Sequence, residues 1–340
     1  FLIFSIMAIV SLGYLLGRVT IKGVSLGTAG VFVISLLYGA FFYQNLTDAL
    51  KSAEIASNGL KIVENLGLVF FVTSVGFIAG PKFFKNLKKN FKSYILLGAA
   101  IILTGGVTCA ICYFIGRGSA NNPQEFIALM DGLLSGSLTT TPGFSAAKET
   151  VKNVYAATPE LANEYEAAVT VGYGIAYLFG VIGVVLFVQI MPKLAHADMD
   201  LERKKLASVD LGTAKTKAEN LIDIDDMGLG AFGMAALIGL VVGNIKIPLT
   251  SAGLSGTCFS LTTTGGALIT ALVFGHFSHV GKVNIMPPKK TLECLRELGL
   301  MIFLIGAGVA GGANFVKYFK PIYFLYGALM TLIPMIVGYL

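Results

Sequence analysis

The sequence has few charged residues for its length. Aspartate, glutamate, lysine and arginine make up 13 % of the 340 residues, whereas a soluble globular protein carries about 25 %. Nineteen acidic and twenty-five basic side chains are too few to cover the surface of a soluble protein of this size. The shortage excludes a disordered chain, a coiled coil and an ordinary cytosolic enzyme.

Cysteine is scarce and tryptophan is absent. Four cysteines are too few for a secreted disulfide scaffold. Cys109 and Cys112 form a C-x-x-C pattern, but the pattern lies in the apolar run 101–115 without the further ligands that a zinc or redox site needs. We therefore interpret both as small apolar residues and expect neither a metal nor a cofactor.

Apolar residues are abundant instead, at 55 % of the chain, with a mean hydropathy of +0.78. A transmembrane helix needs about 20 such residues, so the chain has room for roughly nine or ten helices. The sequence predicts an all-α polytopic membrane protein. The apolar runs are 1–17, 25–43, 66–80, 94–114, 169–191, 227–243, 258–277, 298–312 and 323–340.

The charged loops predict the orientation of the chain. Residues 81–92 contain five lysines and no acid, which places them in the cytoplasm. The net charge of +6 is then explained by this topology, and we expect no nucleic-acid partner. Alternation puts residues 44–65 outside. The run 94–114 then ends outside, and the run 169–191 begins outside. The half-apolar segment 126–147 must therefore enter and leave on one side, as a re-entrant or broken-helix hairpin.

The two halves of the sequence resemble each other. Four blocks recur in the same order, at offsets of 226 to 236 residues. They pair 12–17 with 238–243, 28–39 with 264–275, 66–85 with 298–317, and 94–99 with 323–328. An odd number of crossings in the first half inverts the second. Inverted repeats of about five helices are typical of secondary transporters.

The repeat predicts the domain organisation. Residues 1–192 form the first transmembrane repeat, 193–226 a cytoplasmic linker, and 227–340 the second repeat. Position 340 corresponds to about position 111 of the first half. We therefore expect the second repeat to be incomplete, without its own hairpin and last span.

Two polar segments are candidates for substrate binding. The first lies in the hairpin, where hydroxyls, a proline and a glycine would break a helix and point backbone N–H groups at a carboxylate. Alternatively, its hydroxyls bond only the neighbouring backbone. The candidate residues of this segment are Ser135, Ser137, Thr139, Thr140, Thr141, Pro142 and Gly143.

The second polar segment lies near the start of the run 258–277. Its candidate residues are Thr262, Thr263, Thr264, Gly265 and Gly266. The glycines would let unwound backbone approach a ligand, or they would serve close helix packing. Neither alternative is preferred on the sequence.

Ionisable residues near the hairpin are further candidates. Asp131, Lys148 and Glu149 flank it, and an ionisable group within a membrane is a functional candidate by default. These residues could equally lie at the wet ends of the hairpin. The counter-charge for an anionic substrate stays open, with Arg18 and Arg117 among the possibilities.

The block Gly132–Ala147, together with the Leu-Gly-Leu triplets that begin at Leu66 and Leu298, resembles the bacterial aspartate:alanine exchanger family over almost the whole chain. The resemblance implies a multi-pass antiporter of the bacterial inner membrane, not an enzyme, that exchanges aspartate for alanine. It also implies a homodimer and an elevator-like motion. Relatives that export succinate make a dicarboxylate exporter the first alternative.

The sequence departs from the family pattern in two places. Members carry two cytosolic regulator-of-potassium-conductance-type domains between the halves, but residues 193–226 are about 34 residues, too few for one. The second hairpin and the final span are also missing. A cation/proton antiporter remains an alternative, although it needs an aspartate pair or an aspartate–lysine couple in mid-membrane that the sequence does not make evident. An intramembrane enzyme lacks visible catalytic residues, and a channel would not require substrate on the opposite side.

Overall fold

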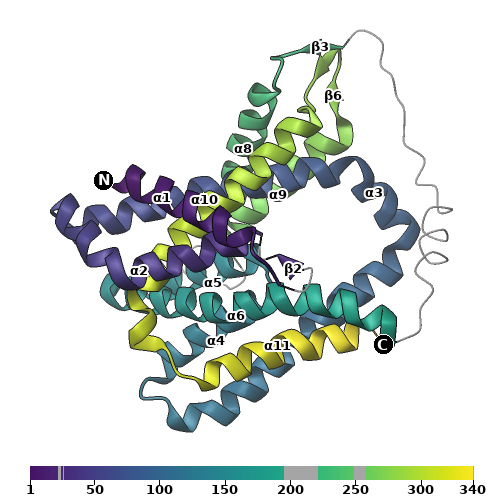
Figure 1. Ribbon diagram of the computed structural model, residues 1–340. Helices are drawn as coiled ribbons and strands as arrows, with labels where there is room; N and C mark the ends of the chain where they lie inside the picture. Colours follow the sequence, from purple (N-terminus) through teal and green to yellow (C-terminus); the bar gives the residue numbers. More distant parts are fainter. Residues whose placement is uncertain (22–23, 26, 195–220, 249–257, 340) are drawn as a thin grey trace. The chain divides into compact units, whose positions relative to one another are not determined.

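The computed structural model describes residues 1–21, 24–25, 27–194, 221–248 and 258–339 (Figure 1). These residues are mostly helical, which confirms the all-α prediction. The helices are α1 (Leu2–Gly17), α2 (Ala29–Leu50), α3 (Ala53–Gly116), α4 (Pro123–Ser137), α5 (Thr141–Val154), α6 (Pro159–Leu194), α8 (Leu229–Gly243), α9 (Thr262–Phe277), α10 (Lys289–Tyr318) and α11 (Ile322–Tyr339). A short 3₁₀ helix, η1 (Arg117–Ser119), follows α3.

The strands are two residues each. An antiparallel pair, β1 (Thr20–Ile21) and β2 (Val24–Ser25), lies between α1 and α2. A second antiparallel pair, β4 (Ile247–Pro248) and β5 (Cys258–Phe259), lies between α8 and α9. The third sheet has the order β3-β7-β6, formed by β3 (Ile222–Asp223), β7 (Val283–Asn284) and β6 (His279–Val280).

Within the described residues, 5 helical segments are long and apolar enough to cross a membrane. They are Ala29–Leu50, Ala53–Phe84, Tyr94–Ser119, Lys289–Tyr318 and Ile322–Tyr339. The shorter helices α1 and α8 are also apolar. The chain is therefore a multi-pass membrane protein, as the apolar runs predict.

Two predicted loops are wrong. Residues 81–92 are helical, because α3 continues through Pro81 to Gly116. Most of residues 44–65 are helical too, since α2 ends at Leu50 and α3 begins at Ala53. The 64 residues of α3 include the candidate span Ala53–Phe84 and most of the candidate span Tyr94–Ser119. Helix α3 therefore contains two spans.

The described chain divides into two compact units. Unit 1 is Phe1–Glu64, Lys92–Lys205 and Phe303–Leu340, and unit 2 is Asn65–Phe91 and Leu206–Ile302. Each unit thus combines segments from both halves of the sequence. Of the predicted linker 193–226, residues 195–220 lie outside the described residues.

In unit 1, glycines bring α4 and α6 into close contact. A Cβ added to Gly132 would clash with the carbonyl oxygen of Val169, and one added to Gly172 would clash with that of Leu129. Helix α11 packs beside both α4 and α6 (Figure 1). The hairpin formed by α4 and α5 is thereby held against α6, and this contact positions its polar residues.

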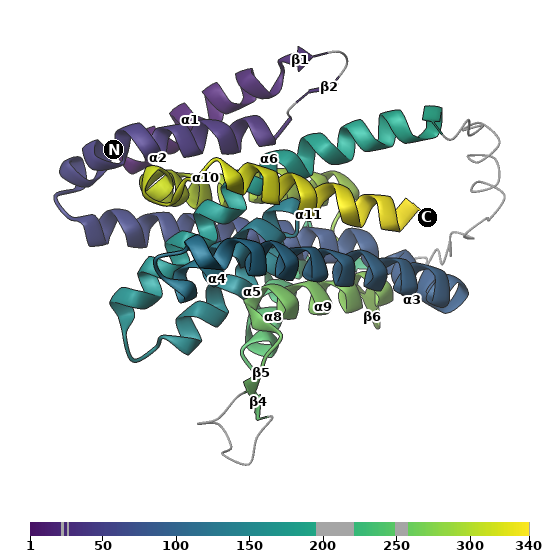
Figure 2. The same ribbon diagram turned by 90° about the horizontal axis from the view of Figure 1, so that it is seen from below.

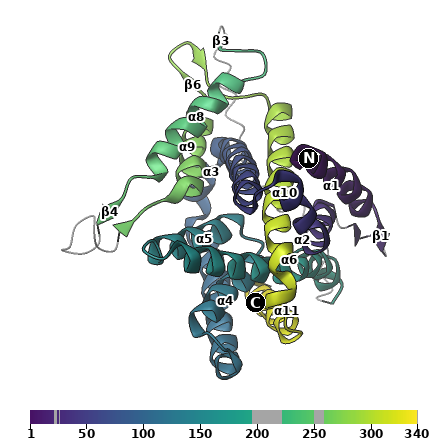
Figure 3. The same ribbon diagram turned by 90° about the vertical axis from the view of Figure 1, so that its left-hand side faces the viewer.

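In unit 2, α8 and α9 lie side by side (Figure 3). Gly239 and Gly243 of α8 leave room for the backbone of α9 at Gly266. Figure 2 shows the β4–β5 pair extending from the ends of these helices. The core of the unit gathers Phe77, Phe232, Ala235, Ala271 and Leu292.

Corresponding glycines of the two halves make corresponding contacts. In unit 1, Gly39 of α2 packs against Val309 and Gly312 of α10. In unit 2, Gly275 of α9 packs against Phe77 and Gly80 of α3. The sequence blocks pair 39 with 275, 77 with 309 and 80 with 312. In each unit the second span of one half therefore packs on the third span of the other half.

Candidate functional site

The predicted break in the hairpin is present at the end of α4. The N–H of Thr139 donates to the carbonyl of Gly136 at 3.0 Å, and the N–H of Thr140 donates to that of Ser135 at 2.9 Å. This pair of bonds is the Schellman pattern of helix C-termini. It places Thr139 in the left-handed region, at a φ of 51°, where β-branched residues are rare.

Helix α5 begins directly after this break. The Thr140 hydroxyl oxygen accepts a hydrogen bond from the Gly143 N–H at 3.2 Å, which is the N-cap contact that starts a helix. Pro142 lies in the first turn, where its missing N–H costs nothing. The local sequence therefore ends one helix and starts the next within three residues.

Most polar groups of this break are bonded within the chain. The Ser135 hydroxyl donates to the carbonyls of Asp131 and Gly132 at 2.9 and 3.0 Å. The Ser137 hydroxyl donates to the carbonyl of Leu134 at 2.9 Å. These bonds agree with the alternative interpretation, in which the hydroxyls of this segment donate to the neighbouring backbone and do not bind substrate. Substrate contact at residues 135–143 stays a prediction.

The second predicted segment starts α9 in unit 2. Thr262 has a φ of 60°, and Gly266 packs on α8, as the packing alternative describes. The structure does not bring this segment into one unit with the hairpin, which lies in unit 1. Its contact with substrate likewise stays a prediction.

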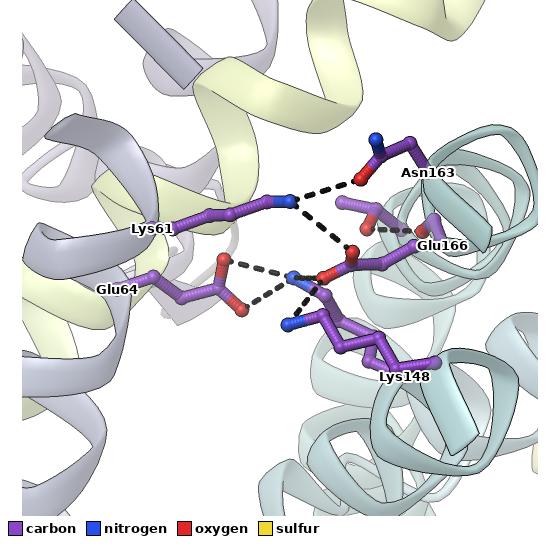
Figure 4. A network of polar contacts seen from close by, with 7 residues as sticks. Lys61, Glu64, Lys148, Asn163 and Glu166 are labelled. Atoms are coloured by element: carbon purple, nitrogen blue, oxygen red, sulfur yellow. Dashed lines mark hydrogen bonds and ion pairs between the residues drawn. The ribbon is translucent and has the colours of Figure 1, made fainter. Parts of the chain in front are cut away.

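The structure reveals a buried charged cluster on the hairpin. Thr141, Phe144, Lys148 and Val151 form the buried face of α5. The Lys148 ammonium donates to both carboxylate oxygens of Glu64, at 2.8 and 2.9 Å (Figure 4). The side chains of Lys148 and Glu64 are only 11 % and 8 % exposed. A buried charge of this kind needs a close partner, and Glu64 provides it.

A second carboxylate completes the cluster. Glu166 of α6 lies 3.3 Å from the Lys148 ammonium and 3.4 Å from that of Lys152. Its other oxygen lies 3.4 Å from the Lys61 ammonium. Lys61 also donates to the side-chain oxygen of Asn163 at 3.2 Å (Figure 4). Helices α3, α5 and α6 thus meet through their charged side chains.

These residues border a cavity of about 410 Å³ within unit 1. Its walls come from the C-terminal ends of α2 and α10, the N-terminal parts of α3 and α6, and Lys148 of α5. The polar and charged lining residues are Tyr43, Ser57, Lys61, Glu64, Lys148, Asn163, Glu164, Glu166, Thr170, Asn314, Lys317 and Tyr318. None of the twelve residues predicted to bind substrate is in this lining.

The cavity contains charges of both signs. Lys317 pairs with Glu164 at 2.7 Å and also donates to the Tyr318 hydroxyl at 3.1 Å. With Lys152 counted, four lysines face three glutamates. One positive charge is in excess, so the cavity suits a ligand with a net negative charge and can also contact an ammonium group.

The sequence singled out Lys148 but not its partners. Glu64 lies at the end of a segment interpreted as a loop, and Glu166 precedes the apolar run 169–191. The available signal was the helix start at Pro159, which places Glu166 two turns inside α6. Asp131, another of the ionisable candidates, lies on α4 outside the cavity lining, and Arg117 packs 5.0 Å from the centre of the Phe114 ring.

The part of the chain that the structure describes contains no group of three or more His, Cys, Asp or Glu side chains placed to bind a metal. Cys109 and Cys112 are buried, free thiols on α3. The charged cavity is therefore the site with the clearest chemistry among the described residues.

Comparison with known proteins identifies the family. Residues 5–193 and 231–340 match the family model Asp-Al_Ex, described as a predicted permease membrane region. The chain belongs to this family. The match covers both halves of the chain and most of its residues.

Named relatives are transporters without assigned substrates. The chain is 32 % identical over 250 residues to an uncharacterized transporter of Bacteroides fragilis, covering 72 % of this chain and 40 % of the relative. It is 31 % identical over 249 residues to one of Bacteroides thetaiotaomicron, with the same coverage of 72 % and 40 %. The chain thus spans about two fifths of the length of these curated relatives. A role in transport is supported, and the substrate is not specified.

Proposed function

We propose that this protein is a secondary antiporter of the bacterial inner membrane that exchanges small carboxylates, aspartate for alanine. The family match and the transporter relatives support transport. The observation that carries the choice of substrate is the position of Lys148. It lies buried on the hairpin, in contact with two buried glutamates at the wall of a cavity.

The lining of the cavity favours an amino acid over a dicarboxylate that has no ammonium group, such as succinate. Aspartate has two carboxylates and one ammonium group, so it can pair with lysines and glutamates together. Succinate has no ammonium group, so both of its carboxylates would compete with Glu64, Glu164 and Glu166 for the lysines. Like charges placed close together in a partly buried site disfavour binding.

The charged cavity and the hairpin break lie at different positions along α5. Thr141 and Lys148 lie seven residues apart on α5, about 10 Å along the axis. The two carboxyl carbons of aspartate are separated by three carbon–carbon bonds, about 4 Å at most. We assign the charged cavity to the first binding of substrate, and the hydroxyls of residues 139–143 to a later contact.

The arrangement of helix ends supports the predicted orientation. Loop charges place the C-terminal ends of α2 and α10 and the N-terminal ends of α3 and α6 outside. The cavity is lined from these same four ends. The cavity would accordingly receive substrate from outside the cell.

The matched glycine contacts support two inverted repeats. Gly39 with Val309, and Gly275 with Phe77, are equivalent pairs in the sequence alignment of the halves. The homodimer and the elevator-like motion are parts of the proposal that rest on family resemblance alone. Exchange requires that the carrier changes sides more readily with substrate bound than when empty. This follows if substrate binds more tightly to the state in which the carrier changes sides.

The same cluster favours a second candidate, a cation/proton antiporter. Such a transporter needs an aspartate pair or an aspartate–lysine couple within the membrane, and Glu64 with Lys148 is a comparable buried pair of a carboxylate and a lysine. The excess positive charge at the cavity would repel a cation, which is why we prefer the carboxylate antiporter. Uptake of a labelled monovalent cation driven by a proton gradient would favour the second candidate.

Exchange in liposomes tests the proposal. The full-length protein is reconstituted, loaded with L-aspartate and assayed for uptake of labelled aspartate, with empty vesicles as control. We expect uptake only into loaded vesicles. Thr140→Ala and Thr141→Ala should reduce it if the hairpin contacts substrate, whereas Thr150→Ala, an exposed position of the same helix, should not. Exchange of succinate alone would reassign the substrate, and absence of both exchanges would refute the carboxylate proposal.

A further inference from the structure

Glu166 has an unusual position for a buried carboxylate. Three ammonium groups surround it, those of Lys61, Lys148 and Lys152, at 3.3 to 3.4 Å. Its side chain is only 5 % exposed, so these three lysines are its main partners. Charge-assisted hydrogen bonds between ammonium and carboxylate groups are about 2.7–2.9 Å. Each of the three ion pairs of Glu166 is therefore longer than a charge-assisted hydrogen bond.

Glu64 provides the contrast within the same cluster. Its two oxygens accept hydrogen bonds from Lys148 at 2.8 and 2.9 Å. Lys148 thus keeps a close partner whether or not Glu166 stays beside it. If the carboxylate of Glu166 moves away, Lys148 keeps Glu64, whereas Lys61 and Lys152, whose side chains are 32 % and 49 % exposed, lose that partner and can pair with an incoming anion. The cluster thus has one fixed and one replaceable anion.

The replaceable anion lies at the cavity wall. Glu166, Lys61, Lys148 and Asn163 all line it, and the Lys61 side chain is 32 % exposed. The cavity of about 410 Å³ is in the range of small-molecule sites, about 300–1,000 Å³. A small carboxylate entering the cavity would meet the lysines on the side that Glu166 occupies.

We infer that Lys61, Lys148 and Lys152 form a carboxylate subsite, which Glu166 fills in this structure and which the substrate carboxylate takes over. The inference rests on the proposed function and deepens it. When the substrate carboxylate binds the lysines, Glu166 moves to the ammonium group of the amino acid. Glu166 is then a competitor for the lysines and a ligand for the amine, which selects α-amino acids over plain carboxylates.

Removing the charge of Glu166 tests this inference directly. Binding of L-aspartate, L-alanine and succinate to the purified full-length protein is measured in detergent by ligand-dependent thermal shift, which reports affinity without transport. Glu166→Gln should bind succinate tighter by about tenfold or more, because a competing charge close to the lysines is gone. Alanine should gain less, because its ammonium group loses a partner.

Matched variants separate the subsite from a general charge effect. Glu160→Gln removes a carboxylate from an exposed position of the same helix, outside the cavity lining, and should leave every affinity within about twofold. Glu166→Asp keeps the charge and should resemble the wild type. Lys61→Gln should weaken binding of all three ligands, whereas Lys320→Gln, an exposed lysine outside the cavity, should not.

The outcomes distinguish the two claims. Unchanged or weaker succinate binding by Glu166→Gln, or equal gains in Glu166→Gln and Glu160→Gln, would overturn the subsite. Tighter binding with no exchange in liposomes would support the subsite and refute the antiporter. Exchange of aspartate without any effect of Glu166→Gln would leave the antiporter and remove the subsite.

Discussion

At the scale of single residues, the proposed site depends on Lys148. Its ammonium is shared between Glu64 and Glu166 in a buried setting, on a helix that begins at a proline-containing break. Burial of three charges is stable only while each keeps a partner. The cluster thus stabilises the fold and is also a candidate binding site. These two roles predict different effects of mutation.

Lys148→Met should destabilise the protein strongly. It leaves Glu64 buried without its hydrogen-bond donor, and breaking a buried pair in this way costs about 3–5 kcal/mol. Lys152→Met is the matched control, because its side chain is 49 % exposed and exposed pairs contribute about 0–1 kcal/mol. Thermal unfolding in detergent measures both. The double variant Glu64→Gln with Lys148→Met should recover part of the loss, and equal shifts for Lys148→Met and Lys152→Met would contradict burial of the pair.

The hydroxyl of Thr140 should stabilise the start of α5. Thr140→Ala removes the N-cap oxygen and should cost about 1 kcal/mol, whereas Thr140→Ser keeps the oxygen and should cost much less. Amide hydrogen exchange at Gly143, whose N–H is the donor, checks the assignment. Faster exchange in both variants, or in neither, would show that the cap does not form in the membrane protein.

The sequence identifies Lys148 but not the residues that it contacts. Glu64 is 84 residues away in the chain, and no local pattern connects the two. Glu64 and Glu166 also lie beside apolar runs, where a charge is ordinarily interpreted as the end of a span. The partners become visible only when α3, α5 and α6 are packed together.

At the scale of elements, apolar runs predict the helices well, because burial in lipid requires them. Eight of the predicted runs, 1–17 among them, overlap separate helices or spans within a few residues at one end or both. Polar helical turns are missed, as at residues 44–50 and 159–168, since hydropathy detects the apolar part of a helix only. The hairpin was predictable because the loop charges require an even number of crossings between 115 and 168.

Gly132 should be essential for packing of the hairpin. A methyl group at this position would clash with the carbonyl of Val169 on α6, and overpacking of this kind costs about 1–3 kcal/mol. A methyl group at Gly106 of α3 would meet no atom within 4 Å among the described residues. Gly106→Ala should therefore be neutral or slightly stabilising, since alanine favours helix by up to about 1 kcal/mol. Melting temperatures of Gly132→Ala and Gly106→Ala that fall together would contradict close packing of α4 on α6.

Asp225 should give unit 2 a pH-dependent stability. Its carboxylate accepts hydrogen bonds from the N–H groups of Leu229 and Gly230 at 2.8 and 2.9 Å, and these bonds lower its pKa from 3.8. A lowered pKa means that the carboxylate stabilises the fold above its ordinary pKa, and that this contribution disappears as the pH falls through the lowered value. Asp225→Asn should melt below the wild type at pH 6, and the difference should vanish in acid. A difference that is independent of pH would exclude a stabilising role for the ionised Asp225 carboxylate at the start of α8.

At the scale of the whole molecule, the two halves share contacts that the linear repeat does not predict. A repeat in sequence suggests that each half packs on itself. Instead, α2 packs on α10 in unit 1 and α9 packs on the first span of α3 in unit 2. The third span of each half thus packs on the second span of the other half. The apolar pattern and the loop charges cannot predict this arrangement, because they describe single segments and not which segments pack together.

The most direct test of the antiporter is exchange of unlike substrates. Vesicles containing the full-length protein are loaded with L-alanine, and uptake of labelled L-aspartate is followed against vesicles without alanine. We predict uptake that requires internal alanine, saturates with external aspartate and is strongly reduced in Lys61→Gln but not in Lys320→Gln. Equal uptake with and without internal alanine, or none in either case, would contradict exchange of aspartate for alanine.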